Sequence, residues 1–89
     1  MYRVIARVVE SKCPHVKVGH KIVIEGPLVN LNETDSLCAT ALASMNHALY
    51  MMKKTSNPRE FGRADAFRLR CPDVEDGVTF EITRVLIDA

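Results

Sequence analysis

The side chains of this sequence best suited to chemistry are three cysteines that lie far apart along the chain. Cys13 occurs in KCPH, Cys38 in TDSLCATAL and Cys71 in RCPD, and His15 follows soon after Cys13. Thiolate and imidazole groups are the usual ligands of zinc, and cysteine thiolates hold iron–sulfur clusters. We therefore identify Cys13, Cys38, Cys71 and His15 as candidate ligands for zinc or for an iron–sulfur centre.

The spacing of the cysteines leaves other interpretations open. The chain has no CxxC pair, which is the compact spacing typical of zinc ribbons. Unpaired cysteine is also among the most frequently buried residue types, so all three could be inert parts of the core of a structural or regulatory module. A third interpretation is an enzyme in which one exposed cysteine, Cys13, acts as nucleophile or acid/base in a pocket at a subunit interface, with His15 or His47 assisting.

Alternating apolar and polar residues predict the strands that must position these cysteines. The runs YRVIARVVE (2–10), AFRLRC (66–71) and VTFEITRV (78–85) have the period of two that is typical of half-buried strands, and KIVIEG (21–26) predicts a second, short strand. The intervening segments, SKCPHVKVGH and PDVEDG, contain proline and glycine, so we expect two hairpins. In the second hairpin Glu81 should face an arginine across the strands.

The Ala-, Leu- and Met-rich segment between the hairpins predicts one helix over about 33–54. Asn32 is the expected N-cap, and Glu33 and Asp35 would suit the positive end of the helix dipole. The order ββαββ predicts an α+β fold, in which one long helix packs on a small antiparallel sheet, open or barrel-like. If the helix begins over the strand ends that carry Cys13 and Cys71, its dipole would favour thiolates there.

The predicted helix has a wide apolar surface. Residues recurring at three- and four-residue steps should form its core face: Leu37, Cys38, Ala41, Leu42, Met45, Ala48, Leu49 and Met52. Ala43, Tyr50 and Met51 widen this face beyond what one small sheet can cover. We therefore expect a homo-oligomer that forms through the helix.

Composition restricts the class of protein. The 89 residues, 47% of them hydrophobic, are enough for one domain, which we place at 1–89. A net charge of +1 without charge runs gives no reason to expect nucleic acid as a partner. No segment has the apolar length of a membrane helix or the features of a signal peptide, so we expect no membrane partner, a cytoplasmic location and reduced thiols.

The segments CPHVKVGHKIVIEGP, TDSLCATAL, RCPD and VTFEITRV together resemble a family of small uncharacterised bacterial and archaeal proteins of about this length. Its members read CP…KVGDK…IEGP, then LCxxAL, then CxD, then VxFxIxR. The resemblance covers nearly the whole chain and implies that Cys13, Cys38 and Cys71 occupy the three cysteine positions of the family. This chain has His20 where the family has aspartate. The resemblance implies no particular reaction.

The leading functional hypothesis from the sequence is a small oligomeric binding or accessory protein. Its cysteine cluster, with His15 as fourth ligand, would hold zinc or an iron–sulfur centre. A larger enzyme is a partner that such an accessory protein could serve. The residues do not specify a substrate.

Overall fold

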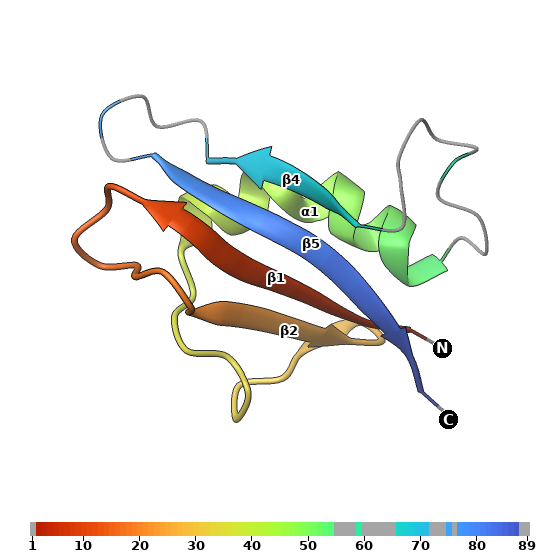
Figure 1. Cartoon of the computed structure of the whole chain (residues 1–89). Helices are drawn as coiled ribbons and strands as arrows, with labels where there is room; N and C mark the ends of the chain where they lie inside the picture. Colours follow the sequence, from red (N-terminus) through yellow and green to blue (C-terminus); the bar gives the residue numbers. More distant parts are fainter. Residues whose placement is uncertain (1, 55–58, 60–65, 72–74, 76, 88–89) are drawn as a thin grey trace.

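One antiparallel sheet carries a helix on one of its faces (Figure 1). The computed structural model describes residues 2–54, 59, 66–71, 75 and 77–87. Within these residues the elements are β1 (Tyr2–Ser11), β2 (Lys21–Glu25), β3 (Leu28–Val29), α1 (Ala39–Lys54), β4 (Phe67–Arg70) and β5 (Val78–Leu86). The strand order is β3-β2-β1-β5-β4, and every pairing is antiparallel.

This arrangement confirms the predicted α+β class and both predicted hairpins, β1–β2 and β4–β5. The sheet is open, with β3 and β4 at its two edges, so the barrel-like alternative is wrong. The strand β3 follows directly after the Gly26-Pro27 turn and was missed from the sequence, because two residues are too few to show a period of two. Gly26 adopts a φ of 60° in that turn, a conformation that favours glycine.

The core lies between α1 and the inner faces of β1 and β5. Val4, Ala6 and Val8 of β1 are at most 2% exposed. Phe80 lies opposite Val8 and Ile82 lies opposite Ala6, and both are equally well buried. The predicted alternation is therefore correct for the two central strands. Across β4 and β5, Arg68 Nε lies 3.6 Å from Glu81 Oε2, which confirms the expected cross-strand ion pair.

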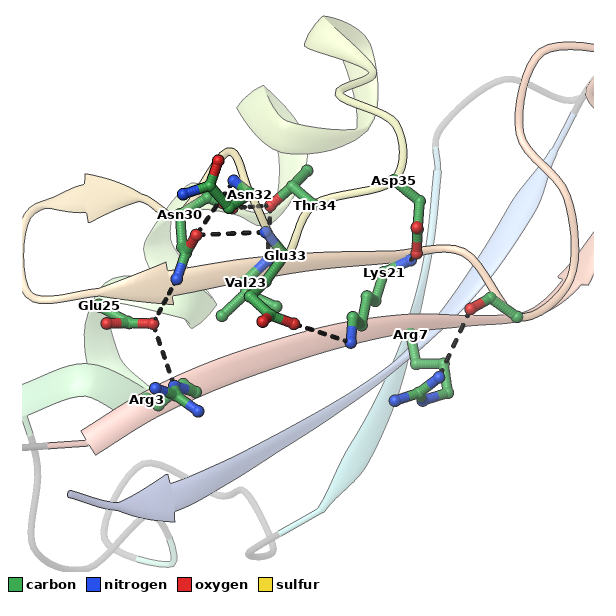
Figure 2. Close-up of polar contacts among 11 residues, drawn as sticks. Arg3, Arg7, Lys21, Val23, Glu25, Asn30, Asn32, Glu33, Thr34 and Asp35 are labelled. Carbon is green, nitrogen blue, oxygen red and sulfur yellow. Dashed lines mark hydrogen bonds and ion pairs between the residues drawn. The ribbon is translucent and has the colours of Figure 1, made fainter.

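The helix begins at Ala39, six residues later than predicted from 33–54. The segment expected to form its first turns instead runs along the outer edge of β2 (Figure 2). Backbone N–H groups of β2 donate to side chains there: Val23 N–H to Thr34 Oγ1 at 3.1 Å and Lys21 N–H to Asp35 Oδ2 at 3.1 Å. Short polar side chains that bond nearby backbone groups compete with helix formation, which explains the difference.

Asn30 closes this edge segment into a turn. Its Oδ1 accepts hydrogen bonds from the N–H groups of Asn32 and Glu33, and its Nδ2 donates to Glu25 Oε1 at 2.7 Å (Figure 2). Arg3 Nε lies 3.1 Å from the same Glu25 oxygen, as an ion pair and not as a well-aligned hydrogen bond. Asn32 is therefore not a helix N-cap, and the carboxylate of Glu33 pairs with a lysine of β2, not with the helix dipole.

The C-terminal end of α1 is fixed by an arginine of β5. Arg84 Nη1 donates to the carbonyl oxygen of Met52 at 3.1 Å, and its guanidinium stacks over the Tyr2 ring at 3.9 Å from the centroid. Arg84 thus provides a hydrogen-bond donor to a carbonyl group of the last helical turn. Its positive charge, like those of Lys53 and Lys54, complements the negative end of the helix dipole.

The predicted core face of α1 is correct over the helix proper. Ala41, Met45, Ala48, Leu49 and Met52 are buried, and Leu42 is half-buried. Leu37 lies before the helix and is 49% exposed. Of the residues expected to widen the face, Met51 is already buried within this chain, whereas Tyr50 and Ala43 are exposed.

Replacing Thr34 by valine tests the role of the edge segment. The substitution removes both bonds of the hydroxyl, the one that it accepts from Val23 N–H and the one that it donates to the carbonyl oxygen of Asn30. We expect the free energy of unfolding to fall by about 1–2 kcal/mol, because a half-buried N–H group loses its partner. Urea denaturation measures this loss.

The matched control is Glu33→Gln, since Glu33 lies in the same segment but makes only an exposed ion pair with Lys21 at 3.4 Å. This variant should change stability by less than about 0.5 kcal/mol. Equal effects of the two substitutions would show that the Thr34 hydroxyl does not support β2.

Candidate functional site

All three cysteines lie at one end of the sheet. Cys13 follows the end of β1, and Cys71 follows the end of β4, where its N–H donates to the carbonyl oxygen of Val78 at 2.8 Å. Next to Cys13, Lys12 N–H donates a hydrogen bond to the carbonyl oxygen of Gly77 at 2.9 Å. The N-terminus of α1, with Cys38, lies at this same end (Figure 1). The condition considered from the sequence, a helix N-terminus at the strand ends that carry Cys13 and Cys71, is therefore met.

Two of the cysteines and a histidine share a surface hollow of about 260 Å³. Cys13 and His15 lie in the loop after β1, and Cys38 is the residue directly before α1. The remaining lining side chains are Val16, Ser36 and Leu37. Cys13 and Cys38 are half-buried, and His15 is exposed. The hollow thus brings two thiols and an imidazole to one place from segments that lie more than twenty residues apart.

Cys71 has a different environment. It is 7% exposed and belongs to the hydrophobic core, whereas Cys13 and Cys38 pack against that core from outside. None of the three forms a disulfide. Among the residues that the structure describes, no three His, Cys, Asp or Glu side chains form a group that could hold a metal ion. Ligation by Cys13, Cys38, Cys71 and His15 together stays a prediction.

Cys38 occupies the N-cap position of α1. Its carbonyl oxygen accepts the first helical hydrogen bond, from Leu42 N–H at 2.9 Å. A side chain at this position lies near the unpaired N–H groups of the first turn, which stabilise negative charge. The first turn of α1 contains no acidic side chain, so no carboxylate of that turn competes for these groups. The Cys38 side chain is therefore placed at the positive end of the helix dipole.

Ser11 orders the loop that carries Cys13 and His15, a role that sequence reasoning missed. Its Oγ accepts a hydrogen bond from Cys13 N–H at 3.2 Å and donates one to the carbonyl oxygen of Val16. The side chain of Val16 is 4% exposed and anchors the far end of the loop in the core. A serine two residues before the loop cysteine is a signal for such a turn.

The other histidines do not line the hollow. Lys17 N–H donates to His20 Nδ1 at 3.3 Å, so this ring takes part in the turn before β2. His47 is exposed on α1. The segment 55–65, in which proline and glycine predict a loop, and the PDVEDG turn at 72–77 fall largely outside the described residues.

Comparison of the chain with protein-family models, curated proteins and solved structures gives no match. The resemblance to the small three-cysteine family therefore stays a prediction. In the described part of the chain, no helix has the length and hydrophobicity needed to cross a membrane.

The different environments of the cysteines predict an order of chemical modification. With iodoacetamide under native conditions, Cys13 and Cys38 should be alkylated while Cys71 is protected, because only Cys71 belongs to the buried core. Peptide mass spectrometry measures the extent of modification at each cysteine. In denaturant all three should react alike. Native alkylation of Cys71 as fast as Cys13 would contradict its placement in the core.

Proposed function

We propose that the protein is a small metal-binding or accessory protein that binds zinc in the hollow at the N-terminus of α1, through Cys13, Cys38 and His15. The observation that carries this proposal is the shared lining of one hollow by two thiols and an imidazole from separate segments. Zinc is bound in proteins by these two donor types. Cys71 belongs to the hydrophobic core against which Cys13 and Cys38 pack.

The donor set favours zinc over an iron–sulfur cluster. Clusters are usually held by four cysteine thiolates, and only two cysteines line this hollow. A third thiolate would require Cys71 to leave the hydrophobic core, with loss of its burial. Two thiolates and one imidazole leave the fourth zinc position to water or to an incoming ligand, as in sites that are not purely structural.

Binding requires the loop after β1 to move inward, since the described residues hold no preassembled group of three ligands. His15 is exposed and lies between Cys13, at the loop's start, and the buried Val16. Ser11 holds this segment at Cys13 and at Val16, and we expect the part between them, which carries His15, to adjust when zinc binds. Metal sites commonly complete their geometry as the ion binds.

Titration with zinc, and with cobalt as its spectroscopic substitute, tests the proposal. The wild-type chain should bind one ion, and cobalt should produce thiolate charge-transfer absorption. Cys13→Ser and Cys38→Ser should each weaken zinc affinity by more than about tenfold, because each removes a metal ligand. Equilibrium dialysis with elemental analysis measures the affinity and the stoichiometry.

Cys71→Ala is the matched control, since it also removes one thiol but from the core. It should lower the unfolding midpoint and leave zinc affinity unchanged. If Cys71→Ala retained the fold but lost zinc binding, Cys71 would be a ligand together with Cys13 and Cys38. Absence of stoichiometric zinc or cobalt binding by the wild-type chain would refute the proposal.

We also propose a homo-oligomer as the working form. Large exposed apolar side chains support it, since Leu28 and Leu31 are each 71% exposed. The mass in solution, measured by sedimentation, tests this proposal independently of the metal.

A further inference from the structure

Among the described residues, α1 has its main contacts with the two central strands of the sheet. It packs over β1 and β5, the two central strands, and it lies farther from β2 and β3. A groove results between α1 and the β2–β3 hairpin. We call it the α1–β3 groove and define it by Ile24, Pro27, Val29, Leu42, Tyr50 and Lys53, which line a hollow of about 120 Å³ there.

Most side chains that line the α1–β3 groove are apolar, and Asn46 and Lys53 are its polar members. Ile24 and Val29 come from the sheet and Leu42 comes from the helix, and all three are only half-buried. They pack against the core on one side and line the groove on the other. Half-buried aliphatic side chains in a concave surface are the usual lining of small-molecule sites.

One end of the groove is cationic. A second hollow, of about 460 Å³, is lined by Lys53, Lys54 and Tyr2, and it shares Pro27 and Lys53 with the first. The two lysine Nζ atoms lie 4.9 and 6.0 Å from the centroid of the Tyr50 ring. The two hollows are therefore neighbours along one surface, with two ammonium groups at the wider end.

These two lysines of α1 differ from three of the cations of the sheet. Arg3, Lys21 and Arg68 each have a carboxylate within ion-pair distance. Within the described part of the chain, Lys53 and Lys54 have no such carboxylate, and no acidic side chain of that part lines either hollow. Two adjacent cations with no carboxylate partner among the described residues form a positively charged surface that attracts an anionic group.

We propose that the α1–β3 groove binds a small amphipathic carboxylate, with its alkyl chain along Val29 and Leu42 and its carboxylate at Lys53 and Lys54. The apolar lining and the cationic end match these two parts of such a molecule. The cationic end of this site lies at the end of α1 opposite the thiol hollow, and the groove extends along the helix as far as Leu42. The proposal does not depend on the zinc proposal.

Titration of the ¹⁵N-labelled protein with decanoate, below its micelle concentration, tests the site. Amide resonances of Val29, Leu42 and Lys53 should shift, and decanoate should bind about fivefold or more tightly than decanol, which lacks the charge. Acetate, which lacks the chain, should produce no saturable shift. Equal affinity for decanol and decanoate, shifts confined to other surfaces, or no binding would overturn the proposal.

The decisive variant is Lys53→Gln/Lys54→Gln, which should bind decanoate as weakly as wild type binds decanol. Lys12→Gln/Lys17→Gln is the matched control, because it removes the same charge from exposed positions in the β1–β2 loop. It should bind decanoate like wild type. A dilution series without ligand comes first, and shifts of the groove resonances on dilution would assign the groove to a second copy of this chain and overturn the proposal.

Discussion

The packing of α1 across β1 and β5 is the contact on which the rest of the structure depends. Met45 and Met52 of the helix and Val8, Phe80 and Ile82 of the two strands are all at most 2% exposed. Burial of each such side chain contributes about 1.5–3 kcal/mol, and in a chain this small few other contacts supply as much. The unbranched methionines suit this interface because they fill irregular space between helix and sheet.

This packing gives the molecule two chemically different ends. The N-terminus of α1 lies over the ends of β1 and β4, so Cys38 meets the loop that carries Cys13 and His15. The C-terminus lies over the start of β1, where Arg84 bonds the Met52 carbonyl and Lys53 lies beside the groove. The helix dipole is positive at the first end and negative, complemented by cations, at the second. One docking contact therefore positions both proposed sites.

The edge of β2 explains the asymmetry of the sheet. Sheet edges expose unpaired backbone groups, and proteins cover them in various ways. Here β3 pairs with only two residues of β2, and side chains of Thr34 and Asp35 bond the rest. The segment that pairs these backbone groups of β2 precedes α1 in the chain. The helix then lies over the central strands, and the inner face beside β3 remains as a groove.

The sequence by itself determined the elements whose signal is local. The alternation of apolar and polar residues in 2–10 and 78–85 was sufficient to predict β1 and β5. The apolar residues at helical spacing from Ala41 to Met52 were sufficient to predict the core face of α1. Only the tertiary structure decided where the helix begins, because the side chains of Thr34 and Asp35 bond to backbone groups of β2, more than ten residues earlier. Likewise, sequence reasoning found all three cysteines but not their different environments. Cys71 is buried and Cys38 lines a hollow because of the way separate segments pack together, and residue spacing does not encode that packing.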